Sequence, residues 1–517
     1  MKDQPHYQGE GYYQGEELPG VPNKIYLGNQ EKPKIDWKRI FFLFFGFAIF
    51  CGVNFSPDWA DAVDPAGKHF VLTQQGKAAI GLFLMTALWW VTEVIPIGVT
   101  SIAVGVVQAL FLIRPPKVVF NEFMDPSVWF IFASLTVGLA FSKSGLTKRL
   151  AYKMLALVGE KTSMIYLGSY IMVALLTFIM AHTAVAAAMF PLLMTIYSLY
   201  DPQGKPSKFG KGLFIGMAFV AGAGSIVTLL GAARGAVALG FYSEMGAKLG
   251  DSFKEVTFFE LTYYMLPLGL LMVFLCWVFF MIFFKPEKDR IPGLKNKVKI
   301  LSKNLGRIKR DEMMTLVIVF SAVAVLSLRS FIPELGALNK SAVLLVTTVL
   351  FFIFKILDIK DLEDIPWNII LLFGGAMCIG FCLWQTGAAN WLAVNWLVMF
   401  QDSHWFVFVM GITLFVLVMT NLIMNVAAIS IILPVALVIA PYLGVAPEVI
   451  LFCALAAAGM PFLLLVGAAP NAIAYESRQF TSGQFFVAGI PMSIVLMLAI
   501  GLFVWKIWPM MGMAVTL

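Results

Sequence analysis

Two ionisable side chains stand inside apolar stretches of the chain. His182 lies in FIMAHTAVAAAMFPLL (178–193), next to Thr183, and Arg234 lies in GAGSIVTLLGAARG (222–235). An ionisable group within an apolar segment is costly, and it usually marks a substrate or ion pathway. A guanidinium can hold an oxyanion through two parallel hydrogen bonds, and an imidazole can carry a proton near neutral pH. The structural alternatives are that Arg234 pairs with a carboxylate or reaches the membrane surface, and that His182 bonds a backbone carbonyl.

The composition is that of a membrane protein. Of 517 residues, 60% are hydrophobic and 13% are charged, and the mean hydropathy is +0.85. Apolar runs of roughly 17 to 25 residues, each long enough to span a bilayer as a helix, recur from Arg39 to the C-terminus. These runs lack the alternation of a transmembrane barrel. We therefore predict an all-α polytopic membrane protein.

The charge pattern divides the chain into four predicted segments. Residues 1–36 are polar, lack a signal peptide and are expected to form a disordered cytoplasmic tail. Residues 285–312 contain ten basic and two acidic side chains between Lys285 and Arg310, so this segment is predicted to be a cytoplasmic linker. It separates two halves, 37–284 and 313–517. We expect a multi-pass protein of the inner (plasma) membrane with a cytoplasmic N-terminus.

The two halves resemble one another. Thr183 precedes a proline by eight residues in HTAVAAAMFP, and Val426 does the same in NVAAISIILP; each proline is followed by a cluster of small residues, 222–235 or 456–471. The run 163–199 is too long for one helix, breaks at its histidine and is flanked by basic residues on both sides, as a hairpin entering from the cytoplasm requires.

The run 405–440 breaks near Asn425 and has no basic flanks, so it can enter from the outside. Broken helices at matching places in two halves indicate a transporter, because unwound backbone survives in a membrane only where it lines a cavity. We expect inverted repeats with two re-entrant hairpins and two broken helices.

Five stretches in this order resemble the divalent anion:sodium symporter (DASS) family of the ion transporter superfamily, over about residues 37 to 510. They are WWVTEVIPIGVTS (89–101), KSGLTKRLA (143–151), IPWNIILLFGG (365–375), TGAANWLA (386–393) and GAAPNAIA (467–474). The resemblance implies a homodimer of inverted-repeat protomers, each with a scaffold domain and an elevator-like transport domain. It also implies that two hairpin tips and two unwound helices enclose one anion and, in typical members, sodium ions.

The chain departs from the family pattern at these places. Typical members carry Ser-Asn-Thr at both tips, whereas this chain has Ala181-His182-Thr183 and Met424-Asn425-Val426. The first unwound loop, typically Gly-Thr-Pro-Pro-Asn, reads Gly231-Ala232-Ala233-Arg234-Gly235, and the second keeps Pro470-Asn471. The resemblance thus makes the substrate-binding candidates His182, Thr183, Arg234, Met424, Asn425, Val426 and Asn471.

The same departures affect sodium. The first half has lost serine and asparagine oxygens and gained an imidazole and a guanidinium, and a fixed cation repels a bound one in a low-dielectric cavity. Our hypothesis is that Arg234 replaces the first sodium ion. Thr420 and Asn425 are candidates for a residual second sodium site, and we expect no other cofactor.

These observations predict a secondary active transporter of organic, dicarboxylate-like dianions, working by anion exchange or by proton coupling through His182. The alternatives are a sodium-coupled dicarboxylate symporter and a carrier of sulfate or sulfonates. An enzyme is disfavoured because the chain has neither HExxH nor a nucleophile–base pair, and ATP-driven transport because it has no GxxxxGK(S/T) loop. The expected partners are the anion, a second copy and the bilayer; nucleic acid is not expected, because the basic residues lie in loops.

Overall fold

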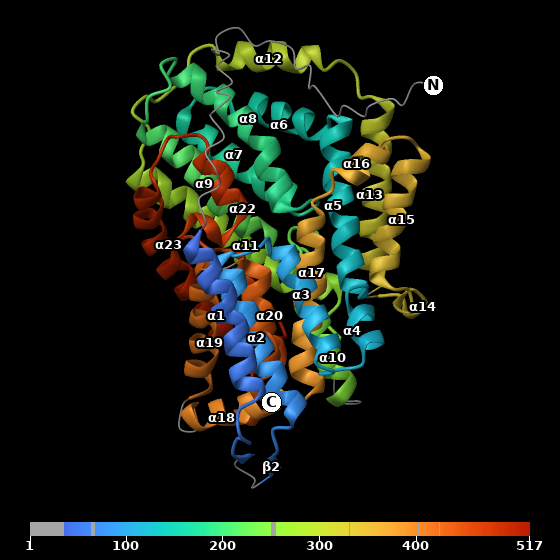
Figure 1. Cartoon of the computed structure of the whole chain (residues 1–517). Helices are drawn as coiled ribbons and strands as arrows, with labels where there is room; N and C mark the ends of the chain where they lie inside the picture. The colour runs from blue at the N-terminus through green and yellow to red at the C-terminus, as the bar shows by residue number, and fades with distance from the viewer. Residues whose placement is uncertain (1–35, 64–67, 250–254, 330, 401–403, 423) are drawn as a thin grey trace, which may run out of the picture.

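The computed structural model describes residues 36–63, 68–249, 255–329, 331–400, 404–422 and 424–517. The predicted tail therefore lies outside the described residues, apart from Asp36. The described part of the first half forms eleven helices and one short hairpin (Figure 1). They are α1 (Trp37–Asn54), β1 (Ala62–Val63), β2 (His69–Phe70), α2 (Gln74–Thr92), α3 (Ile97–Leu110), α4 (Pro116–Glu122), α5 (Pro126–Ser144), α6 (Leu146–Val158), α7 (Thr162–Thr177), α8 (His182–Tyr200), α9 (Lys208–Ser225), α10 (Arg234–Leu249) and α11 (Phe258–Phe283).

The predicted linker contains one helix, which lies across the upper end of the molecule in Figure 1, and the second half is again helical. These elements are α12 (Leu294–Asn304), α13 (Arg310–Leu328), α14 (Pro333–Gly336), α15 (Lys340–Ile353), α16 (Ile359–Glu363), α17 (Trp367–Gln385), α18 (Ala388–Phe400), α19 (Trp405–Leu422), α20 (Asn425–Tyr442), α21 (Pro447–Gly459), η2 (Leu465–Gly467), α22 (Ala469–Tyr475), α23 (Ser482–Leu502), η3 (Phe503–Ile507) and α24 (Trp508–Met510).

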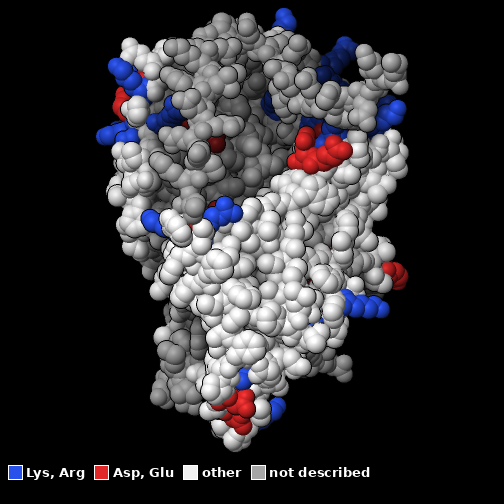
Figure 2. Space-filling model, in the orientation of Figure 1, with Lys and Arg blue, Asp and Glu red and all other residues white. Residues whose placement is uncertain are grey.

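Apolar helices of membrane-spanning length dominate the fold. Among the described residues, nine helical stretches are long and apolar enough to cross a bilayer. On the face shown in Figure 2, charged side chains gather toward the two ends, and few lie on the broad band over α2 and α3. The prediction of an all-α polytopic protein is confirmed.

The helices break where the sequence predicts. In the run 163–199, α7 ends at Thr177 and α8 begins at His182; in the run 405–440, α19 ends at Leu422 and α20 begins at Asn425. Two further breaks separate α9 from α10 and α21 from α22. The halves interlock at these breaks, since α10 packs against α20, and α22 packs against α8 and α9.

The helix α7, which precedes the first of these breaks, packs closely on α9. The hydroxyl of Tyr170 donates a hydrogen bond to the carbonyl of Gly212 at 2.7 Å, and Tyr166 donates to the carbonyl of Phe209 at 2.9 Å. Both tyrosines are buried and stacked on one another. Only helix positions without a side chain leave room for these rings, and α9 supplies them at Gly212 and Gly216.

Replacing Gly216 by alanine tests this packing. The new Cβ would overlap the Tyr170 hydroxyl, so we expect a loss of about 1–3 kcal/mol through overpacking. The measurement is the thermal unfolding midpoint of the detergent-solubilised protein. Gly52→Ala in α1 is the control, because no atom lies within 4 Å of its added Cβ; a midpoint of Gly216→Ala no lower than that of the control would contradict the packing argument.

Candidate functional site

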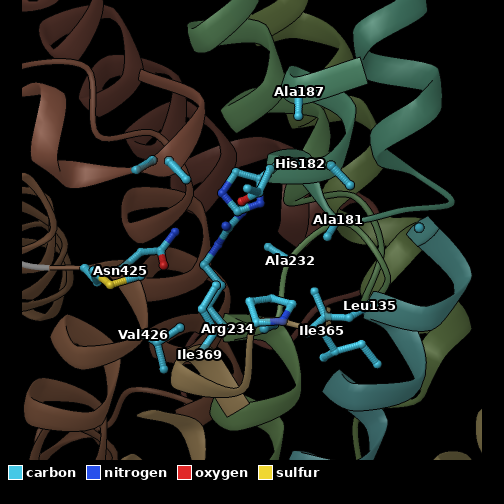
Figure 3. Close-up of a pocket in the computed structure, with 18 of the residues that line it drawn as sticks. Leu135, Ala181, His182, Ala187, Ala232, Arg234, Ile365, Ile369, Asn425 and Val426 are labelled. Carbon is cyan, nitrogen blue, oxygen red and sulfur yellow. The ribbon is translucent and has the colours of Figure 1, made fainter. Parts of the chain in front are cut away.

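A cavity of 410 Å³ lies where the helix breaks of the two halves meet. The first residues of three helices line it: His182 of α8, Arg234 of α10 and Asn425 of α20 (Figure 3). The N-cap residues of α8 and α20, Ala181 and Met424, provide no side-chain hydrogen bond to their helices. Apart from the N–H of His182, the N–H groups at the start of these two helices are therefore left to bind what enters the cavity.

Arg234 is the buried cation of this cavity. Its side chain is 2% exposed, and its Nη2 donates a hydrogen bond to the hydroxyl of Ser225 at 2.7 Å. Nη1 has no hydrogen-bond partner, and no carboxylate of the described residues lies within 4.0 Å of the guanidinium. Arg234 therefore neither pairs with a carboxylate of the described residues nor extends to the membrane surface, which were the two structural alternatives.

His182 faces the same guanidinium. Its backbone N–H donates to the carbonyl of Gly231 at 2.9 Å, which joins the tip of the first hairpin to the loop before α10. Figure 3 shows the side chain of Arg234 extending toward the imidazole ring. The Nδ1 atom of His182 is buried without a partner. One ring nitrogen of His182 is thus left without a partner, whereas the carbonyl of Gly231 lies close enough to the ring to accept a hydrogen bond from it.

The second hairpin contributes a less polar wall. Met424, Asn425 and Val426 all line the cavity, and Thr183 lines it from the first hairpin. The carboxamide of Asn425, which points into the cavity in Figure 3, forms no hydrogen bond with the described residues. It is available to a ligand, whereas Met424 and Val426 offer only apolar surface.

Two sequence-predicted residues lie outside the cavity lining. The carboxamide nitrogen of Asn471 donates to the carbonyls of Pro461 and Leu464 at 2.9 and 3.1 Å, within the loop before α22. The hydroxyl of Thr420 donates to the carbonyl of Ala458 at 3.2 Å. In this structure Asn471 holds the unwound loop before α22, Thr420 holds the last turn of α21, and the structure does not bring Thr420 and Asn425 onto one wall of the cavity.

Sequence reasoning missed the roles of two groups of residues. Asn421, whose Oδ1 accepts the N–H groups of Leu463 and Leu464 at 2.8 and 3.2 Å, supports the second loop, as Ser225 supports Arg234. An apolar wall from α5 and from the start of α17 faces the hairpin tips; it consists of Leu135, Leu139, Ile365, Ile369 and Phe373. The only sequence signal for this wall is that DPSVWFIFASLTVGLAFSKSGL (125–146) and IPWNIILLFGGAMCIGFCLWQTGA (365–388) occupy corresponding places in the two halves.

Charged groups also lie beside the cavity, on the side of α16. Asp364 lines it, and Lys143 of α5 pairs with Asp358 at 2.8 Å and with Asp361. The hydrogen bond from Lys143 lowers the pKa of the exposed Asp358 carboxyl. Figure 2 shows this acidic patch over α16 at the rim of a hollow.

The electrostatics of the cavity favour an anion. Each helix N-terminus carries roughly half a positive charge, and three of them converge with the guanidinium. No group of three or more His, Cys, Asp or Glu side chains that could hold a metal ion occurs in the described ranges. The arrangement is suited to binding and releasing an anion.

The family follows from the sequence comparison. A family model described as the sodium:sulfate symporter transmembrane region matches residues 60–514. The chain belongs to this family, the divalent anion:sodium symporters. This DASS protein is therefore a secondary transporter of a multi-pass membrane family, and not an enzyme.

Curated relatives and solved structures agree with this assignment. The DASS chain is 25% identical over 467 residues to the sodium-dependent dicarboxylate transporter SdcS of Staphylococcus saprophyticus, covering 86% of this chain and 89% of that protein. SdcS of Staphylococcus aureus is likewise 25% identical over 459 residues, covering 85% and 87%.

Two solved transporters share the fold. The YdaH transporter of Alcanivorax borkumensis has a TM-score of 0.55 at 14% identity, covering 93% of this chain and 99% of that one. MtrF of Neisseria gonorrhoeae has a TM-score of 0.56 at 14% identity, covering 90% and 93%.

Gly459 gives a test of the site geometry. A Cβ at this last residue of α21 would lie 2.6 Å from Nη2 of Arg234, so Gly459→Ala should displace the guanidinium from Ser225. We expect affinity for succinate or sulfate to fall at least tenfold, the equivalent of one hydrogen bond to a charged group. Isothermal titration measures it. Gly483→Ala, whose Cβ would meet only one atom at 3.9 Å, should bind normally; equal affinities in both variants would contradict this geometry.

Proposed function

We propose that this protein is a secondary active transporter of organic dianions of the dicarboxylate class, which it binds in the cavity between the hairpin tips. The observation that carries the proposal is the guanidinium of Arg234, buried at the cavity with a free Nη1 and with no carboxylate partner among the described residues. The curated relatives named as dicarboxylate transporters support the substrate class.

A bound carboxylate would compensate this buried charge. A buried cation without a counter-ion is costly, and an anion at 4 Å is attracted by about 4 kcal/mol at an effective dielectric constant of 20. The planar guanidinium suits a carboxylate, because it offers parallel N–H groups. One carboxylate of the substrate would thus bind Arg234 and the N–H groups at the start of α8.

The second carboxylate would bind on the opposite hairpin. Asn425 and the first-turn N–H groups of α20 are the polar groups of that wall. Met424 and Val426 replace hydrogen-bonding side chains there, so this end of the substrate is held less tightly.

Coupling is proposed to proceed by anion exchange or by a proton on His182. The residues of the first half do not fit a sodium ion, because the hydroxyl of Ser225 accepts a hydrogen bond from Arg234 and the guanidinium repels a second cation. The second candidate is sodium-coupled symport, favoured by the sodium-dependent relatives; Thr420 and Asn425 would then supply oxygens only after Thr420 releases the carbonyl of Ala458.

The proposal also includes the oligomeric state, the orientation in the membrane and the movement of the hairpins. The protein would act as a homodimer in the plasma membrane, with its N-terminus in the cytoplasm and an elevator-like movement of the hairpins against α5 and α17. The apolar wall of α5 and α17 supports such a movement, because it offers the hairpin tips a surface without specific hydrogen bonds.

Removing the guanidinium tests the substrate site. We expect Arg234→Gln to lower uptake of radiolabelled succinate into proteoliposomes at least 100-fold, and Arg234→Lys to retain part of it, because lysine keeps the charge but not the parallel N–H groups. Arg310→Gln, an exposed arginine at the start of α13, is the control. Uptake by Arg234→Gln equal to that of the control would overturn the proposal, and competition by sulfate but not by succinate would change the cargo class.

Coupling is tested by His182→Gln, because glutamine can hydrogen-bond but cannot titrate. We expect exchange of external against internal succinate to persist in sodium-free buffer, while uptake driven by an inward proton gradient is lost in the variant. Both rates are measured in the same proteoliposome preparation. A steep, saturating requirement for two or more sodium ions in the unmodified protein would establish sodium symport instead.

A further inference from the structure

A basic pocket lies outside the transport cavity, where α7 begins and α11 ends. It has a volume of 350 Å³ and is lined by three cationic side chains, Lys161, Lys285 and Arg290, and by one carboxylate, Asp289. None of the three cations has a carboxylate within 4.0 Å in the described part of the chain. The pocket thus carries an excess of positive charge.

The backbone holds two of these cations next to each other at the pocket. Lys161 and Arg290 form an antiparallel bridge, in which the N–H of Thr162 donates to the carbonyl of Asp289 at 3.0 Å and the N–H of Ile291 donates to the carbonyl of Glu160 at 2.9 Å. The cluster is therefore built by chain segments that are far apart in sequence. Random basic side chains on a cytoplasmic loop would have no such anchor.

The pocket also offers hydrogen bonds to an anion. The N–H groups of Ser163 and Met164, in the first turn of the 16-residue helix α7, find no acceptor among the described residues, and the Ser163 hydroxyl forms no hydrogen bond with them either. Lys161, the N-cap residue, provides no side-chain cap. Of these groups, the N–H and the hydroxyl of Ser163 line the pocket, and together with the three cations they suit a phosphate group.

Two lipid-facing apolar stripes run up to this pocket. Exposed side chains on one face of α7 are Met164, Ile171 and Leu175, and those on one face of α11 are Leu270, Phe274 and Ile282. The two helices pack against each other. Because the chain spans a bilayer, these faces contact acyl chains, and a basic pocket between such helices is suited to an acidic headgroup.

We propose that this pocket binds the headgroup of an anionic phospholipid, with its acyl chains along the exposed faces of α7 and α11. The stripes favour a lipid over free phosphate, since they add apolar contact that a soluble anion cannot use. Asp289 lowers the net charge of the pocket and so favours a singly charged phosphodiester over a more highly charged phosphate. Bound there, the lipid would brace the base of the first hairpin.

The test uses the full-length protein in detergent, with phosphatidylglycerol as the probe and phosphatidylcholine and inorganic phosphate as comparisons. Native mass spectrometry counts retained lipid, and the thermal unfolding midpoint reports binding. We expect selective retention of phosphatidylglycerol, weakened about fivefold for each cation removed in a Lys161→Gln, Lys285→Gln, Arg290→Gln triple variant. The matched control, Lys297→Gln, Lys299→Gln, Lys303→Gln on α12, removes the same charge from exposed positions and should bind normally.

Any of the following results would contradict binding of a phospholipid headgroup in this pocket. Equal loss of phosphatidylglycerol in both triple variants would show diffuse attraction to the membrane surface. Equal stabilisation by inorganic phosphate would show a free-anion site. Should the pocket variant not fold, Lys161→Arg, Lys285→Arg, Arg290→Lys keeps the charges and must retain the lipid; its failure to do so overturns the proposal.

Discussion

A helix that ends inside hydrocarbon must find partners for its terminal N–H and C=O groups, and this constraint governs the structure around the cavity where the helix breaks meet. Hydrogen bonds between the segments at the helix breaks supply some of these partners. The N–H of His182 donates to the carbonyl of Gly231, and Oδ1 of Asn421 accepts the N–H groups of Leu463 and Leu464. Asn471 binds two further carbonyls. With the loops held by these bonds, the first turns of α8, α10 and α20 are left to face the cavity.

The starts of α8 and α20 and the candidate residue Arg234 could be identified from the sequence, because each depends on residues that are close together in the chain. An uninterrupted apolar run longer than a membrane span must break. A polar residue nine positions before a proline, His182 or Asn425, marks each break, so α8 and α20 begin where the sequence predicts. Arg234 could be recognised because a guanidinium among glycine and alanine residues of an apolar segment is costly unless an anion compensates its charge.

Features that depend on contacts between distant segments could not be predicted. Asn471 and Thr420 were identified by type and position, but the carbonyl groups that accept their hydrogen bonds belong to the loop before α22 and to the end of α21, whose positions are set only by tertiary packing. The apolar wall of α5 and α17 shows no special pattern, because leucine, isoleucine and phenylalanine are common in every membrane helix. The support of Arg234 by Ser225 depends on the loop between α9 and α10, whose course has no sequence signal.

The contact of Gly459 with the guanidinium has a consequence for how such a chain can diverge. Gly459 of α21, in the second half, has no side chain. The guanidinium of Arg234, from the first half, occupies the space that a side chain would fill there. The shape of the cavity around Arg234 accordingly depends on two stretches more than 200 positions apart. A chimera that joins the first half of this chain to the second half of a relative with a larger residue at that place would inherit a blocked pocket, however well each half folds.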